Sequence, residues 1–153
     1  MAEAEGATLL VGGGRPEDAS LQSGLFIQPT IFGDVTPDMR IVQEEVFGPV
    51  AVIQRFSDDD HAVELANATP FGLAAGVWTR DVKRAHIMAR RLIAGTVWIN
   101  TYRKTNYATP FGGFKDSGIG RENGQHAVRE FTEEQLVWLD LGEGVSDPFN
   151  PFA

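Results

Sequence analysis

Two adjacent glutamates, Glu44 and Glu45, are the side chains of this sequence best placed for chemistry. They are followed by Phe47 and a Gly48-Pro49 break, and then by an apolar run. Such a carboxylate pair could act as a general acid and base, as metal ligands, as a clamp for sugar hydroxyls, or only as a solvated turn. Loops that lead into strands often carry functional groups because a rigid scaffold positions them.

Extended-chain geometry narrows these alternatives. Adjacent residues on an extended chain point to opposite sides, so only one of the two glutamates faces a given site. The pair is therefore not a glycosidase pair, which needs two carboxylates facing each other across roughly 5–9 Å. Glu45 and Phe47 lie two apart and share a face. A carboxylate beside an aromatic ring suits a ribose, which predicts a binding role, and no catalytic residue is assigned.

The remaining reactive residue types do not form a second site. The sequence contains no cysteine, so a thiolate nucleophile and thiolate metal ligands are excluded. The three histidines are far apart in predicted helices, and no metal site is predicted. The aspartates at 58–60 are interpreted as a helix N-terminus. The glycines at 12–14 are interpreted as a turn. A dinucleotide fingerprint, G-x-G-x-x-G, needs a third glycine three residues after its second one and a helix that follows, and both are missing here.

Length and charge bound the class of protein. A chain of 153 residues with 42% hydrophobic residues predicts one or at most two globular domains. The formal charge of −8 argues against nucleic-acid or anionic-membrane partners, but a phosphate-bearing cofactor needs only local amides and one or two cations. The first residues lack the pattern of a signal peptide, and no apolar run is long enough to span a bilayer, so a cytoplasmic protein is expected.

The regular elements alternate between strands and helices. Strands are predicted at 50–56, 73–79 and 96–100, with helices at 59–68 and after Asp81. This β-α-β-α-β order predicts an α/β fold with a parallel sheet flanked by helices. Ligands of such sheets lie beyond the carboxyl ends of the strands, which draws attention to Asn100 and the loop 101–120. Residues 1–7 are expected to be frayed, and 25–32 is expected to be an edge strand or two short strands because Pro29 interrupts it.

Three C-terminal features complete the prediction. The glycine-rich loop 110–124 either contacts a phosphate or substrate through its backbone or is a structural turn, and a helix is expected at 121–130. Residues 134–141 are apolar at nearly every position, which predicts a strand that needs burial on both faces or a partner's sheet edge. Residues 142–153 are predicted to be a disordered tail.

Four motifs in order resemble a known family. They are EEVFGPV from 44, ANATPFGLAA from 66, GTVWIN from 95 and PFGGFKDSGIGRENG from 110, with FTE at 131–133 after them. Together they resemble the C-terminal segment of the NAD(P)-dependent aldehyde dehydrogenases. The resemblance runs from about residue 6 to residue 141.

The resemblance implies specific roles. Glu45 would bind the nicotinamide ribose, Phe47 would pack against the ribose and nicotinamide, and Phe111 would line the aldehyde tunnel. Residues 1–141 would be the C-terminal part of the catalytic domain, and the strand 134–141 would join the sheet of a neighbouring subunit in a homo-oligomer.

The same resemblance implies an incomplete enzyme. The family's cysteine nucleophile, its general base and its dinucleotide-binding fold lie outside the matched region. This chain alone is therefore predicted to be inactive and to bind NAD or NADP weakly or not at all, unless a separate chain supplies the upstream part. The alternative is a non-catalytic assembly or interaction module that retains the fold.

Overall fold

The first part of the chain builds a three-stranded sheet. The structure is a computed structural model that describes residues 1–139, 141 and 149. Strand β1 (Thr8–Val11) pairs antiparallel with β2 (Thr30–Gly33), and β2 pairs in parallel with β3 (Val50–Val52). Of the two alternatives expected at 25–32, an edge strand or two short strands, neither is found, because the structure has the single strand β2 and it is the central strand. Pro29 lies just before it, so the residue without an N–H stays outside the ladder.

A small core closes one end of this sheet. The 3-10 helix η1 (Ala2–Glu5) and the short helix α1 (Arg40–Gln43) pack together through buried side chains. These side chains are Ala2, Ala7, Met39 and Ile41. The expectation of a frayed N-terminus at 1–7 is therefore wrong, because its small alanine side chains fit against Met39 and Ile41. A second 3-10 helix, η2 (Ala19–Leu21), lies between β1 and β2.

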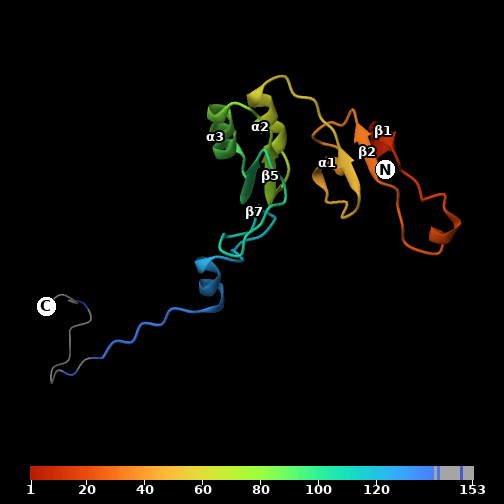
Figure 1. Cartoon of the computed structure of the whole chain (residues 1–153). Helices are drawn as coiled ribbons and strands as arrows, with labels where there is room; N and C mark the ends of the chain where they lie inside the picture. The colour runs from red at the N-terminus through yellow and green to blue at the C-terminus, as the bar shows by residue number, and fades with distance from the viewer. Residues whose placement is uncertain (140, 142–148, 150–153) are drawn as a thin grey trace.

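The second part of the chain is a parallel pair of strands covered by two helices. Strand β5 (Ala74–Val77) pairs in register with β6 (Thr96–Ile99). Helices α2 (Asp59–Asn67) and α3 (Val82–Arg91) lie beside this pair, as Figure 1 shows. The predicted α/β class and both helices are confirmed. The three predicted strands do not share one sheet, however, because β3 pairs only with β2 and the chain then runs through 53–58 to α2.

A third, smaller pair of strands carries the glycine-rich loop. Strand β4 (Phe71–Gly72) pairs antiparallel with β7 (Phe114–Lys115). The strand predicted at 73–79 is shorter in the structure, where β5 covers 74–77 and pairs with β6. The helix expected at 121–130 is replaced by a 3-10 helix, η3 (Gln125–Phe131), which begins after Gly124 at a positive φ of 64°.

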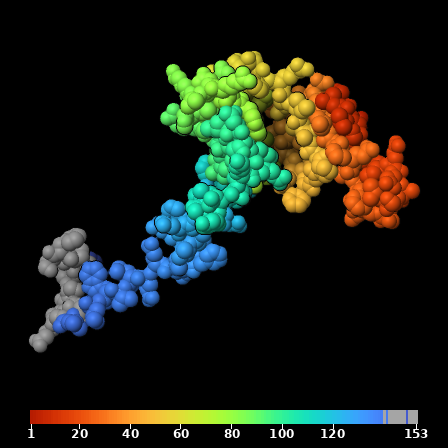
Figure 2. All heavy atoms as spheres, viewed as in Figure 1, coloured from red at the N-terminus to blue at the C-terminus, as the bar shows by residue number. Residues whose placement is uncertain are grey.

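The segment after η3 runs away from the body of the molecule (Figures 1 and 2). Residues 132–139 and 141, called the arm below, form no helix or strand. The strand predicted at 134–141 is not formed among the residues of this segment that the structure describes, and its pairing with a neighbouring subunit stays a prediction. The predicted disordered tail at 142–153 lies outside the described residues, apart from Phe149.

The chain exposes an unusually large surface for its mass. Its accessible area is 12350 Å², whereas a compact monomer of this mass exposes about 7,600 Å². Among the described residues no side chain is fully buried. Much of the apolar surface of this chain therefore lies open to further protein contacts. None of the helices in the described part is both long and apolar enough to cross a membrane.

Candidate cofactor-binding site

The two adjacent glutamates occupy different environments. Helix α1 ends at Gln43, and Glu44 follows in an extended conformation. The Glu44 carboxylate accepts hydrogen bonds from Nε and an Nη of Arg40 at 2.8 and 2.9 Å. These hydrogen bonds and the positive charge of Arg40 lower the pKa of Glu44 below its ordinary value. The side chain of Glu45, in contrast, makes no hydrogen bond or ion pair with any described residue, so it is available to a ligand.

Phe47 is held in a conformation that an aromatic residue rarely adopts. Its φ is +53°, in the left-handed region, where a bulky side chain is a genuine outlier. The residue is 91% exposed. The extended geometry expected from Glu45 to Phe47 is therefore wrong at Phe47, where the backbone turns into Gly48-Pro49. Strain of this kind is concentrated at functional sites.

Glu45 and Phe47 nevertheless border the same surface depression. It is an open hollow of about 480 Å³ between α1 and β3. Its lining consists of residues 41, 44–48 and 50–52. A carboxylate without a partner among the described residues and an exposed aromatic ring fit the hydroxyl edge and the face of a ribose. No cation lines the hollow, so the residues present fit only the ribose side of a dinucleotide.

Phe111 lies in a different part of the molecule. Its backbone forms an isolated antiparallel bridge with Glu122, with hydrogen bonds of 2.8 and 2.7 Å. The half-buried ring borders a hollow of about 330 Å³ formed by the glycine-rich loop and η3. This hollow shares no lining residue with the depression at Glu45. The structure therefore does not bring Phe111 together with Glu45 and Phe47.

The glycine-rich loop is hydrogen-bonded to the segment 67–72, which connects α2 to β5. Lys115 donates to the backbone oxygens of Asn67 and Thr69 at 2.8 and 2.9 Å. The hydroxyl of Ser117 accepts from the N–H of Gly72 at 3.0 Å. Arg121 donates to two carbonyls of its own loop and stacks over a phenylalanine ring. Both cations of the loop thus contact groups of this chain, which favours a structural turn over a phosphate contact.

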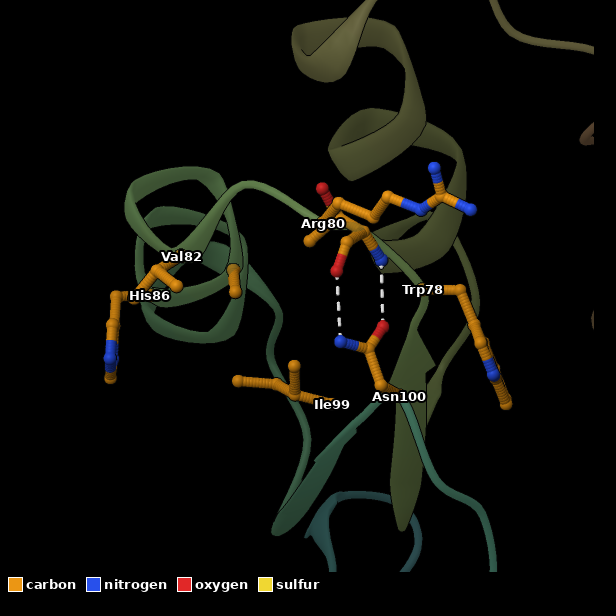
Figure 3. A pocket seen from close by; sticks show the side chains of 8 residues that line it. Trp78, Arg80, Val82, His86, Ile99 and Asn100 are labelled. Atoms are coloured by element: carbon orange, nitrogen blue, oxygen red, sulfur yellow. Dashed lines mark hydrogen bonds between the residues drawn. The ribbon is translucent and has the colours of Figure 1, made fainter.

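Asn100 directly follows β6, and its side chain continues the pairing of β5 with β6. Its amide accepts from the N–H of Thr79 and donates to the carbonyl of Thr79, both at 2.8 Å. Figure 3 shows this pair of hydrogen bonds in a pocket of about 700 Å³. The side chains of His86, Arg80 and Trp78 point away from Asn100 in the same view. The polar groups do not converge, so this pocket has no geometry for a ligand.

The three consecutive aspartates have structural roles, as predicted. Asp58 accepts from the N–H of His61 at 2.9 Å and caps α2. Asp59 pairs with Arg84 at 3.0 Å, and Asp60 pairs with Arg91 at 2.6 Å, which ties α2 to α3. Across the part of the chain that the structure describes, no three histidines or carboxylates are grouped as a metal site would require.

Two residues near the site were not identified from the sequence. Arg40 was missed although its spacing of four from Glu44 is the signal of a helical ion pair. Glu5 was missed because nothing in the sequence indicates its long-range contact. Its carboxylate accepts from the backbone N–H of Arg40 at 2.9 Å, across 35 positions of the chain.

Comparisons with known proteins agree with this fold. The model of the aldehyde dehydrogenase family matches residues 1–137. The betaine aldehyde dehydrogenase of Brucella anthropi is 50% identical over 147 residues, which are 96% of this chain and 30% of that protein. The Brucella melitensis protein of the same name is 48% identical over the same share. The chain therefore spans about 30% of the length of these relatives.

Solved structures give the same result. The betaine aldehyde dehydrogenase of Staphylococcus aureus in complex with NAD+ aligns with a TM-score of 0.83 at 46% identity, over 85% of this chain and 26% of that one. The NAD+ complex of an aldehyde dehydrogenase from Bacillus cereus has a TM-score of 0.83 at 49% identity, over 92% and 28%. The expectation that the matched share is the C-terminal end of the family's sequence stays a prediction. Because the family model covers nearly the whole sequence and the solved relatives share its fold, the chain belongs to the aldehyde dehydrogenase family.

Proposed function

We propose that this chain supplies the nicotinamide-ribose side and the aldehyde-tunnel side of an NAD(P)-dependent aldehyde oxidation, and that it is inactive alone. In this proposal the Glu45 carboxylate accepts hydrogen bonds from the ribose hydroxyls. The ring of Phe47 packs against the ribose and nicotinamide. Phe111 lies in the wall of the tunnel through which the aldehyde enters. When bound, the cofactor accepts the hydride of the oxidation.

One observation carries the proposal: Glu45 has no partner among the described residues, while Glu44 beside it is held by Arg40. A carboxylate that is exposed, unpaired and adjacent to an aromatic ring is suited to bind a polar ligand. The NAD+ complexes of relatives that are 46% and 49% identical support NAD+ as that ligand. The relatives' name supports betaine aldehyde as the substrate to test first.

The predicted inactivity follows from what the sequence lacks. A structure of the Staphylococcus aureus enzyme contains NAD+ and a cysteine modified by BME, which marks a reactive thiol in that protein. Covalent catalysis on an aldehyde requires such a nucleophile to hold the substrate beside the nicotinamide. This chain has no cysteine. Only a ribose edge and a tunnel wall are available here, so a second polypeptide segment must supply the rest.

The test uses the chain alone and a chimera. In the chimera this chain replaces the 147 matched residues of the Brucella anthropi enzyme. We expect no NADH from the purified chain with NAD+ and betaine aldehyde, and steady NADH formation from the chimera. Glu45→Gln in the chimera removes a charge-assisted hydrogen bond and should raise the KM for NAD+ at least about tenfold.

A matched control separates the site from general effects of charge. Glu64→Gln removes another exposed carboxylate, from the surface of α2, and the KM for NAD+ should not change. NADH formation by the chain alone would refute the predicted inactivity. An unchanged KM in the Glu45→Gln chimera would refute the cofactor role of Glu45.

A second candidate function, a non-catalytic assembly module, is favoured by the arm. Its apolar side chains at 136–139 and 141 are between 74% and 86% exposed. A run of this kind is suited to pair with the sheet edge of another chain. Titration of the isolated chain with NADH distinguishes the two functions. Saturable binding favours residual cofactor function, whereas self-association without binding favours assembly.

A further inference from the structure

We propose that Arg40 is a positioning residue for cofactor binding: by holding the carboxylate of Glu44 in an ion pair, it leaves Glu45 as the carboxylate that receives the ribose. This inference rests on the proposed function of Glu45. It assigns to Arg40 a role through its neighbour, since Arg40 does not line the depression and makes no proposed contact with the cofactor.

Arg40 and Glu44 are joined through both backbone and side chains. The backbone N–H of Glu44 donates to the carbonyl of Arg40 at 2.7 Å, which closes the last turn of α1. The guanidinium and the carboxylate meet in two parallel hydrogen bonds, a geometry that fixes orientation as well as distance. The backbone direction at Glu44 is thus set, and with it the start of the segment that carries Glu45 and Phe47.

Arg40 is itself anchored to the rest of the chain. Its backbone N–H donates to Glu5, which connects α1 to η1 and to the buried alanines of the core. The last residue of α1, Gln43, is also anchored, since its side chain donates to the carbonyl of Ala68 at 3.2 Å. The helix that carries Arg40 therefore has contacts on both sides, and the ion pair transmits that fixed position to Glu44.

The charge of Arg40 matters as much as its position. Glu44 and Glu45 are adjacent and both border the depression. Without the guanidinium, Glu44 would present a second negative charge there, free to compete for the ribose hydroxyls and to repel the pyrophosphate of a dinucleotide. The side chains of Arg40 and Glu44 are 58% and 54% exposed, so solvent screens the pair and the effect is expected to be modest.

The test is steady-state kinetics of the chimera with NAD+ and betaine aldehyde. Arg40→Met should raise the KM for NAD+ about threefold, with kcat and the KM for the aldehyde unchanged. Arg40→Lys keeps the charge but not the paired hydrogen bonds, and should recover part of the loss. The double variant Arg40→Met with Glu44→Gln removes the unpaired charge as well, and should return the KM for NAD+ to near its original value.

Each other outcome contradicts the proposal. A raised KM in both Arg40→Met and the double variant would show that Arg40 acts only by packing. An unchanged KM in Arg40→Met, alongside a raised KM in Glu45→Gln, would overturn the role of Arg40 and leave the proposed function standing. If Glu45→Gln has no effect, both fail together. Thermal midpoints of the variants, measured in parallel, show whether each one folds.

Discussion

The paired helices α2 and α3 differ from the arm in how many of their polar and apolar groups find partners within the chain. Each of the two helices begins with a capping aspartate, and two ion pairs join them. Asn67 adds a clasp, because its amide donates to the carbonyl of Arg91 and accepts from the N–H of Ile93, both at 2.9 Å. The arm has neither regular structure nor buried apolar side chains among its described residues. The comparison separates a unit that is locally complete from a segment whose apolar pattern requires a partner.

The strongest test of this difference concerns the arm. Trp138 is 86% exposed, and we expect the chain to self-associate through this region. Trp138→Asp should weaken self-association about 30-fold, the effect of losing one aromatic anchor of about 2 kcal/mol. Analytical ultracentrifugation over micromolar concentrations measures it. Tyr107→Asp changes an equally exposed aromatic outside the arm and should have no effect. A wild-type chain that stays monomeric would break the comparison.

A test of the helix pair addresses the Asn67 clasp. Asn67→Ala removes two hydrogen bonds and leaves the N–H of Ile93 and the carbonyl of Arg91 without these partners. We expect a loss of about 2 kcal/mol in the free energy of unfolding, measured by urea denaturation. Glu64→Ala, on the same helix without a partner among the described residues, should change it by less than about 0.5 kcal/mol. Equal losses in the two variants would mean that the clasp contributes nothing.

A smaller effect is expected at the start of α3. The carboxylate of Asp81 accepts from the N–H of Arg84 at 3.0 Å. Asp81→Ala should lower the free energy of unfolding by about 1 kcal/mol, the usual contribution of a side-chain N-cap. Asp81→Asn retains an acceptor and should lose less. A loss from Asp81→Asn as large as that from Asp81→Ala would argue against capping as the cause.

The smallest expected effect is a pH dependence at the start of α2. Hydrogen bonds from the backbone N–H of His61 and then from the Ser57 hydroxyl lower the pKa of Asp58. Because the folded pKa is lowered, the stabilisation is fully present above the ordinary value of about 3.9 and is lost as pH falls through the lowered pKa. Asp58→Asn should therefore reduce the acid-induced fall in unfolding free energy, measured by urea denaturation at a series of pH values below about 4. An unchanged pH profile would contradict this.

The same contrast explains which parts of the fold the sequence predicts. Helices α2 and α3 are predictable to within a residue or two because their signals are local: an aspartate cap, apolar residues at helical spacing, and a break after the last turn. The parallel pairing of β5 with β6 follows from the helix between them. The burial of Ala2 and the separation of β3 from β5 depend on contacts between distant residues, and no local pattern indicates them.

The residues of the candidate site also differ in how far the sequence predicts them. Glu45 and Phe47 could be selected from residue type and spacing, and the structure brings both to one depression. The left-handed conformation of Phe47 could not be predicted, since an aromatic residue does not favour it. The long-range anchoring of Arg40 by Glu5 has no sequence signal. Phe111 was placed by resemblance alone, and within this chain it lies in a separate hollow.

The contact between Glu5 and Arg40 has a practical consequence for work with this protein. The first turn of the chain, η1, holds helix α1, which precedes Glu45, although η1 and α1 are far apart in the sequence. Cleavage of the first five residues by a contaminating protease, or their replacement by an affinity tag, would release that helix and mimic a defect in cofactor binding. Mass spectrometry of the intact N-terminus should therefore precede each titration.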